Sequence, residues 1–411
     1  MTYRHLSLSK WSLSLCPLYE VRGKSVHIKK TTDSNQLYEL SNQWDELLSL
    51  GDSSSLPLTH GWISAWWKEF NTHKSLCIFS VYKEQKLIAI APFYEENSTY
   101  RGIPVKQLHL LSDGHSPYCD IIYDDSLSDK QITQVLTLIV EENKNDLIIF
   151  SKIPKTSPTY SCLLNPVFSK QFNTIINKNL ITPTIKISGN WDEFFKKRSR
   201  KFIKNINNKL NRFKKETDFT IDCENVSTID HPVLSDILEV SKKSWKASIK
   251  ADLGSDIAGK NFLLDLVDTF GSNNHIQVWI LRKNSIPVAY EFHVIYDNIV
   301  YPIRADYDEN YKKYSPGSIL EYTALKYLFD EQRVTEYYTC ADNYWYLNNW
   351  SNDLREHFTI ELFSSNFKAH SLHFIEKHMI PIARYIKAKL QTKHKNNSGP
   401  KETKIQTINQ V

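Results

Sequence analysis

Apolar residues follow two patterns in the first half of the chain, helical spacing and short continuous runs. Residues 34–49 and 62–70 place leucine and tryptophan side chains at helical spacing. Apolar runs at 75–82 and 87–96, joined by a polar turn, are typical of paired strands. This half therefore begins with helices and continues into an antiparallel meander. The same criteria predict a strand at 105–111, a helix at 130–143 and a strand at 146–153.

The second half repeats this order of elements. Helices are predicted at 233–246 and 261–270, followed by a meander of three strands over 275–307. A helix after Ser315-Pro316-Gly317-Ser318 and a strand at 333–340 complete the series. The recurrence indicates a tandem duplication. The predicted fold class is α+β or α/β, with two domains of mixed, mostly antiparallel sheets flanked by helices.

The two halves are separated by a proline-rich stretch and a basic segment. Residues 154–183 contain four prolines and are predicted to be a connecting loop. Residues 194–215 are predicted to form one long helix with an apolar stripe. Residues 196–215 carry ten Lys or Arg and no acid, so the net charge of +5 becomes 41 − 46 = −5 elsewhere. This local basicity favours a phosphate-bearing partner or an anionic surface, and a plain solvated face is the alternative.

Composition limits the class of protein. A chain of 411 residues with 41% hydrophobic content is long enough for two cores. The six cysteines lie far apart without a Cys-x-x-Cys pair, which indicates a reducing, cytoplasmic location. No apolar run reaches the roughly 18 residues that a membrane span requires. We expect a cytoplasmic protein, with the basic segments 196–215 and 366–390 as candidates for peripheral membrane contact.

The meander of the second half contains two acidic residues of interest. If Asp297-Asn298 is a two-residue hairpin turn, Glu291 lies opposite Arg304 and their ion pair explains both residues structurally. Asp306 has no such partner in this register and stands at the strand end before the Pro-Gly segment. It is therefore the better catalytic candidate.

The segment Ser315-Pro316-Gly317-Ser318 starts a helix. Unpaired N–H groups in the first helical turn attract anions, and Gly317 lacks the Cβ that would hold a phosphate away. Pro316 fixes the backbone, while the two serine hydroxyls can cap the helix or bind an anion. A capped helix after a turn is the alternative. The corresponding position of the first half, "YDDSLSDKQ", carries three acids and is expected to repel a phosphate.

Several motifs together resemble a known family. They are "SGNWDEFFKKRSRKFIKNINNKL", "SKKSWK", "SIPVAYEFHVIYDNIVYPIRADYDENYKKYSPGSIL" and "ADNYWY". Residues 191–346 resemble the C-terminal half of GNAT-like acetyltransferases of the cellulose-biosynthesis (CelD-like) group, which are related to Fem-type tandem GNAT transferases. Residues 44–153, with "WISAWW" and "LIAIAPFY", resemble the N-terminal half.

The resemblance implies two GNAT folds and an acyl-CoA site in the second. Acetyl-CoA or another acyl-CoA would lie between the strand ending near Asp306 and the strand 333–340. The cofactor-binding loop would be formed by Tyr311, Tyr314, Ser315, Pro316, Gly317 and Ser318.

The chemistry at this site is assigned to two residues. Asp306 is proposed as base or orienter, and Tyr344 as the proton donor to the leaving thiolate. The sequence departs from the family pattern at "DNYWY", which lacks the expected lysine after the tyrosine.

The expected function is transfer of an acyl group to an amine or hydroxyl of a saccharide or an envelope or exopolysaccharide precursor. The alternatives are a Fem-type transferase that uses aminoacyl-tRNA bound to the basic helix, and a non-enzymatic protein that binds an anionic polymer. His370 and His373 could place two imidazoles on one helix face, with Glu376 and His378 nearby. No metal is expected, because the segment lacks a third ligand at reliable spacing.

The predicted domain organisation has five parts. They are a partly disordered leader at 1–27, an N-terminal domain without cofactor at 28–165, a C-terminal domain with the acyl-CoA site at 184–365, a terminal helix at 366–390 and a disordered tail at 391–411.

Overall fold

The structure, a computed structural model, describes most of the chain. The described residues are 19–21, 24–49, 51, 55–112, 114–216, 218–351 and 353–397. Most of the predicted leader and the end of the predicted tail lie outside them. Residues 391–397 are not part of a tail, because the last helix continues to Asn397.

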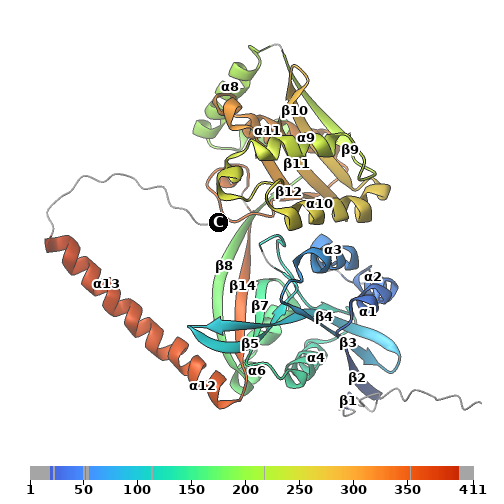
Figure 1. Ribbon diagram of the computed structural model, residues 1–411, viewed down its shortest axis with the longest axis vertical. Coiled ribbons are helices and arrows are strands. Elements are labelled where there is room, and N and C mark those ends of the chain that lie inside the picture. Colours follow the sequence, from blue (N-terminus) through green and yellow to red (C-terminus); the bar gives the residue numbers. More distant parts are fainter. Residues whose placement is uncertain are drawn as a thin grey trace, which may run out of the picture.

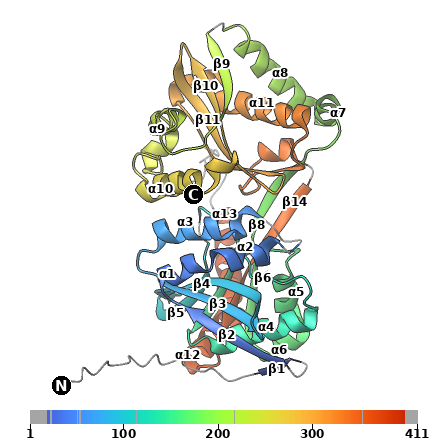
Figure 2. The same ribbon diagram turned by 90° about the vertical axis from the view of Figure 1, so that its right-hand side faces the viewer.

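One mostly antiparallel sheet runs through both halves (Figures 1 and 2). Its strand order is β1-β2-β3-β4-β5-β7-β14-β8-β13-β12-β11-β10-β9, and β6 pairs with β4. The strands are β1 (Tyr19–Val21), β2 (Lys24–Thr31), β3 (Ser75–Lys83), β4 (Lys86–Tyr100), β5 (Ile103–Leu110), β6 (Ile122–Tyr123), β7 (Leu147–Pro154), β8 (Asn173–Lys186), β9 (Phe219–Asn225), β10 (Ile276–Lys283), β11 (Ile286–Tyr296), β12 (Ile299–Tyr307), β13 (Glu336–Tyr338) and β14 (Asp353–Phe363).

Helices flank this sheet in each half (Figure 1). The α-helices are α1 (Ser34–Glu39), α2 (Ser41–Ser49), α3 (His60–Phe70), α4 (Asp129–Glu142), α5 (Pro158–Leu164), α6 (Pro166–Gln171), α7 (Trp191–Lys196), α8 (Arg200–Phe213), α9 (Val233–Lys242), α10 (Ile257–Phe270), α11 (Pro316–Glu331), α12 (Phe367–Phe374) and α13 (Ile380–Asn397). Short 3₁₀ turns include η4 (Glu309–Tyr314), and a π-helical turn, η6 (Ile375–Met379), joins α12 to α13.

The predicted repetition of elements is present. In the first half β2 to β5 form a meander, α4 follows, and β7 pairs with β5 in parallel. In the second half β9 to β12 form a meander, α11 follows, and β13 pairs with β12 in parallel. Strands β14 and β8 pair with each other between the two units and complete the sheet.

The prediction of a loop over 154–183 is wrong. This stretch forms α5, α6 and most of β8. Pro158 and Pro166 are the first residues of their helices, a position that tolerates the missing N–H. Pro183 lies inside β8, paired with Leu354 of β14. Two of the four prolines therefore mark helix starts, and the stretch is not an unstructured connection.

The prediction of one long basic helix is also wrong. The chain breaks after Lys196, and a second helix, α8, starts at Arg200. Ser199 caps α8, because its Oγ accepts a hydrogen bond from the Phe202 N–H at 3.2 Å. Trp191 packs against Trp350 beside this break, so tertiary contacts fix the bend.

The two halves share one apolar core. Trp62 of α3 contacts Phe262 of α10 with 5.0 Å between ring centroids, and Phe70 contacts the same ring at 5.5 Å. Residues of both halves belong to a single buried cluster. In the described part of the chain no helix is long and apolar enough to cross a lipid bilayer.

Candidate functional site

Strands β12 and β13 pair only where they begin. Their parallel ladder consists of Ile299 with Glu336 and Val300 with Tyr337, and β12 continues to Tyr307 without a further β13 partner among the described residues. Ligands of open α/β sheets bind in the crevice beyond the carboxyl ends of strands whose connections diverge. The divergence of β12 and β13 therefore marks a candidate site, at the point where β12 leads into α11.

The first turn of α11 is not capped by a side chain. Ser315, the residue before the helix, has left-handed backbone angles (φ 55°, ψ 50°), and its side chain makes no capping hydrogen bond. Pro316 occupies the first helical position. The first-turn N–H groups carry the partial positive charge of the helix dipole. This turn lies beside Tyr307, the last residue of β12.

The fold itself does not require glycine at position 317. A Cβ added to Gly317 would meet only the Tyr307 Cδ1 at 3.8 Å, which is an ordinary contact, and Gly317 does not have a positive φ. The glycine therefore leaves space beside the first helical turn without being needed for the turn. This observation favours a ligand over a purely structural reason for the residue.

A cationic cavity of about 320 Å³ opens beside this turn. It joins two segments that the sequence indicated separately, α8 and the Pro-Gly loop. Arg212 Nη1 donates to the Lys313 carbonyl at 2.7 Å, and Lys209 Nζ donates to Ser318 Oγ at 2.8 Å. Both ribbon views show α8 beside α11 (Figures 1 and 2). The cavity is lined by Lys201, Lys204, Asn205, Asn208, Lys209, Arg212 and Ser315.

The two loop tyrosines make packing contacts. Tyr311 contacts the buried cluster under α11, and its ring lies 6.5 Å from that of Tyr314. Tyr314 also contacts Phe219 at 5.4 Å, with Lys283 Nζ 5.2 Å from its ring centroid. These contacts hold η4 against the sheet, and a direct cofactor contact by either tyrosine stays a prediction.

The predicted register of β11 and β12 is correct near the turn and wrong beyond it. Val294 lies opposite Tyr301 and His293 opposite Pro302, as expected. A β-bulge then shifts the register by one residue. Arg304 consequently lies opposite Phe292, so the predicted Glu291–Arg304 ion pair does not form.

The bulge brings Asp306 opposite Tyr290 on the face that packs against α9. The Asp306 carboxylate is buried and has two cationic neighbours, with Lys246 Nζ at 2.6 Å and Arg304 Nε at 3.1 Å. The Tyr290 hydroxyl donates to it at 2.7 Å and the Ser241 hydroxyl at 3.0 Å. The Asp306 carboxylate therefore has contacts with four side chains, two of them cationic.

Tyr344 lies in the segment after β13. Its side chain is 49% exposed, and its ring stacks on Tyr346 with 5.7 Å between centroids. The described contacts do not link Tyr344 to Asp306. The structure thus places the two predicted catalytic residues in separate environments.

The opposite face of the sheet carries an acidic cluster that sequence reasoning did not assemble, because it assigned Glu291 to an ion pair with Arg304. Glu291 and His293 of β11 are buried there, with His293 Nε2 3.0 Å from Glu291 Oε2. Glu321 of α11 is close enough for its charge to interact with that of Glu291. Burial, followed by the Glu291 charge, raises the pKa of Glu321 to about 8. The Glu-x-His spacing on one strand face was the available signal.

This cluster adjoins the cationic cavity and the segment after β13. Lys209, which lines the cavity, interacts electrostatically with Glu321, and burial lowers the pKa of Lys209. Burial, and next the Glu321 charge, raise the pKa of Tyr346 to about 12. The α11 face therefore combines a cavity lined by cations with a carboxyl group whose pKa is raised to about 8.

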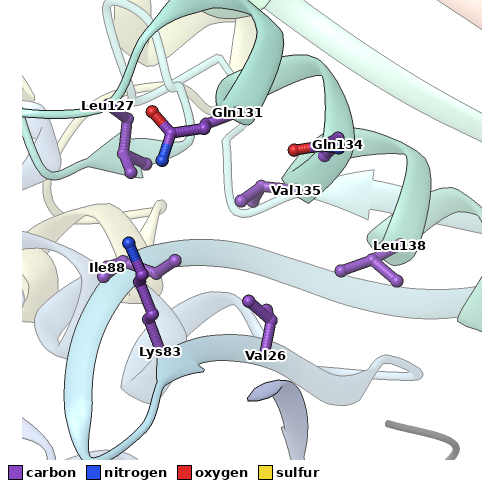
Figure 3. Close-up of a pocket in the computed structure, with 8 residues that line it drawn as sticks. All are labelled: Val26, Lys83, Ile88, Leu127, Gln131, Gln134, Val135 and Leu138. Carbon is purple, nitrogen blue, oxygen red and sulfur yellow. The ribbon is translucent and has the colours of Figure 1, made fainter. Parts of the chain in front are cut away.

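The corresponding helix start of the first half is different. Ser128 and Gln131 form a reciprocal capping box at α4, and Asp124 pairs with Lys86 Nζ at 2.5 Å. The hollow beside α4 has a volume of about 10 Å³, enough for one water molecule (Figure 3). It is mainly apolar, and its lining residues are Val26, Lys83, Ile88, Leu127, Gln131, Gln134, Val135 and Leu138.

The histidines near the C-terminus make other contacts. Glu376 accepts two hydrogen bonds from Arg101, each 2.7 Å long, and His370 Nδ1 lies 3.0 Å from Asn173 Nδ2. Within the described ranges no group of three or more His, Cys, Asp or Glu side chains is arranged to hold a metal ion. The absence of a metal stays a prediction.

Comparison with known proteins gives one family match. A family described as "Acetyltransferase (GNAT) domain" matches residues 200–346, which include α8, the Pro-Gly loop and Tyr344. No curated protein matches the chain.

Solved structures match over most of the chain. FemX aligns with a TM-score of 0.50 at 11% identity, covering 82% of this chain and 97% of FemX. A tandem GNAT protein from the clavulanic acid biosynthesis pathway aligns with a TM-score of 0.50 at 8% identity, covering 83% and 99%. The C-terminal domain of a putative lysylphosphatidylglycerol synthetase from Agrobacterium fabrum aligns with a TM-score of 0.50 at 10% identity, covering 82% and 95%. At such low sequence identities the structural similarity shows a shared fold and nothing about activity. The chain has a mixed α/β, tandem GNAT-like fold.

Proposed function

We propose that this protein is an acyl-CoA-dependent acyltransferase whose acceptor is an amine or hydroxyl of a saccharide or of an envelope or exopolysaccharide precursor. One observation carries the proposal: cations of α8 lie beside the uncapped start of α11, near the divergence of β12 and β13. Acetyl-CoA or a longer acyl-CoA provides the phosphates for this cavity. The saccharide acceptor rests on the family resemblance alone.

The binding step would use the loop and α8. The N–H groups of Gly317 and Ser318, with Lys201, Lys204 and Arg212, would hold the pyrophosphate. Gly317 would allow the phosphate to approach the backbone, and Ser315 and Ser318 would add hydroxyl donors. Pro316, Tyr311 and Tyr314 would keep the loop in position. The thioester would then extend toward the open edge of β12.

The transfer step needs a proton acceptor and a proton donor. The acceptor nitrogen or oxygen attacks the thioester carbonyl carbon, the C–S bond breaks, and the thiolate takes up a proton. We assign removal of the acceptor's proton to Glu321, whose carboxyl group lies near that of Glu291. Tyr344 would donate a proton to the thiolate. Asp306 would act as an orienter, since its carboxylate already binds Lys246 and Arg304.

A Fem-type transferase is the second candidate. The exposed cations of α7 and α8 extend beyond the cavity, through Lys196, Lys197 and Arg200 on one side and Lys214 and Lys215 on the other. Such a surface fits the backbone of a tRNA. A non-enzymatic protein that binds an anionic polymer would use the same surface without the Glu321 cluster.

Binding measurements separate these candidates. We expect acetyl-CoA or longer acyl-CoAs to raise the melting temperature and to be hydrolysed slowly, with release of a free thiol. Binding of aminoacyl-tRNA would instead weaken steeply with salt, by about 10³-fold or more between 50 and 200 mM for several phosphate contacts. Absence of any thermal shift or thiol release with every acyl-CoA would overturn the acyltransferase proposal.

A further inference from the structure

The C-terminal helix exposes an apolar stripe. Five apolar side chains of η6 and α13 are between 52% and 61% exposed. Apart from two that are neighbours in the chain, they follow one another at intervals of three or four residues, which places them along one side of the helix. The five are Met379, Ile382, Tyr385, Ile386 and Leu390.

The base of this helix is fixed to the N-terminal half. Ala369 and Leu372 of α12 are buried against Phe363 of β14. The Arg101 guanidinium holds Glu376 with two hydrogen bonds of 2.7 Å. Beyond this anchor α13 projects away from the body of the molecule (Figure 1). The exposed stripe is therefore presented at a defined position.

Beyond Glu376 the charge of this helix is of one sign. From Lys377 to Asn397 the sequence contains six Lys or Arg and no Asp or Glu. Lys377, Arg384 and Lys387 are exposed.

Lys387 borders the apolar stripe, whereas Lys377 and Arg384 lie on the opposite side of the helix, where Arg384 Nη2 is 4.0 Å from Glu376 Oε1. Lys389 lies within the stripe, with its Nζ 4.8 Å from the Tyr385 ring centroid. A helix with an apolar side and a basic opposite side matches the interface of an anionic bilayer.

We propose that η6 and α13 dock this protein on the surface of an anionic lipid membrane. The apolar stripe enters the boundary between headgroups and acyl chains. The side chains of Lys377, Arg384 and Lys387 reach the lipid phosphates. The charge pattern disfavours a second copy of the chain as the occupant. Two such helices would bring twelve cations together, with no carboxylate between residues 377 and 397 to pair with them. The proposal is independent of acyl transfer.

Flotation of the full-length protein with vesicles tests the proposal. The vesicles contain either phosphatidylcholine alone or three parts phosphatidylcholine to one part phosphatidylglycerol. We expect binding to the second kind only, weakening as salt rises. The Ile382→Ser/Ile386→Ser protein should bind at least roughly tenfold more weakly. Arg384→Gln/Lys387→Gln should lose roughly tenfold and become less sensitive to salt.

Two control variants change similar residues elsewhere. Ile229→Ser removes an isoleucine that is 50% exposed, and Lys130→Gln removes an exposed lysine at α4. Both control variants should bind vesicles like the unaltered protein. Circular dichroism should show that the two double variants and the two controls are folded. Three results would each overturn the proposal. They are no binding to anionic vesicles, binding that survives both double substitutions, and a dimer in analytical ultracentrifugation that the Ile382→Ser/Ile386→Ser change dissociates.

Discussion

The two halves repeat one arrangement of strands and helix, but their central helices begin differently. In the first half α4 closes its own start with a capping box, next to Asp124 and Lys86. In the second half α11 starts without a side-chain cap and faces the cations of α8. The same fold thus supplies a closed helix start in one copy and an uncapped helix start beside cations in the other. The difference lies in a few residues around the helix and not in the sheet.

The largest expected effect concerns the sixth residue of each helix, which is Glu321 in α11 and Gln134 in α4. Glu321→Gln makes the second half resemble the first. Because it removes the proposed proton acceptor, kcat/KM should fall about 10²-fold or more. In the unaltered enzyme kcat/KM should rise with pH through an apparent pKa near 8, since the carboxylate form of Glu321 is the active one.

Glu331→Gln at the end of α11 is the matched control and should keep both the rate and the pH profile. Stability gives a second measurement that does not require the substrate. The folded state holds the Glu321 proton up to a pKa of about 8, compared with an ordinary value of 4.5. The free energy of unfolding should therefore decrease as pH rises across that window, and Glu321→Gln should remove this part of the decrease. Identical profiles for the two proteins would contradict the assignment.

A second test reverses charge in the cavity of the second half. Lys201→Glu/Lys204→Glu should weaken acyl-CoA binding by about 100-fold, because each reversal replaces attraction to phosphate with repulsion. Isothermal titration calorimetry measures the dissociation constant. Lys130→Glu/Lys144→Glu beside the ends of α4 is the control and should leave binding unchanged. Equal losses in both variants would show that overall charge, and not the α8 cavity, attracts the ligand.

A third test fills the space left by the glycine. Gly317→Leu should weaken acyl-CoA binding about tenfold, because the side chain occupies the approach to the first turn of α11. The melting temperature should stay the same or rise, since leucine favours helix more than glycine does. Lys130→Leu changes the second residue of α4 and should affect neither quantity. If Gly317→Leu lowered the melting temperature as much as it lowered binding, the loop would be only a helix start.

The smallest expected effect concerns Tyr344. Tyr344→Phe should lower kcat by about fivefold with KM nearly unchanged, since it removes a proton donor but no binding contact. Tyr346→Phe, on the stacked neighbouring ring, is the control. An unaltered rate in Tyr344→Phe would remove this tyrosine from the mechanism.

Local patterns predicted much of the fold. The helical spacing at 62–70 and 130–143 corresponds to α3 and α4. The apolar runs of the two meanders correspond to β3, β4, β10, β11 and β12. The strands β2, β9 and β14 were not predicted. Strand β9 lies at the edge of the sheet, and its burial pattern shows no fully buried position. The residues of β9 therefore show no clear pattern of apolar positions from which a strand could be predicted.

The sequence by itself determined the duplicated order of elements, the local basicity of α8 and the unusual helix start at Pro316-Gly317. Each depends on residues that are neighbours along the chain, whose spacing and charge can be read directly.

Tertiary structure alone decided which of these features meet. Packing brought Lys209 and Arg212 to the Pro-Gly loop, although the segments lie about a hundred residues apart. A single bulge moved Arg304 away from Glu291 and placed Asp306 beside Tyr290, because one extra residue shifts the pairing of every residue beyond it. The same fold brought Glu321 near Glu291. Desolvation of Glu321, followed by the Glu291 charge, gives the Glu321 carboxyl group a pKa that a solvated glutamate does not have.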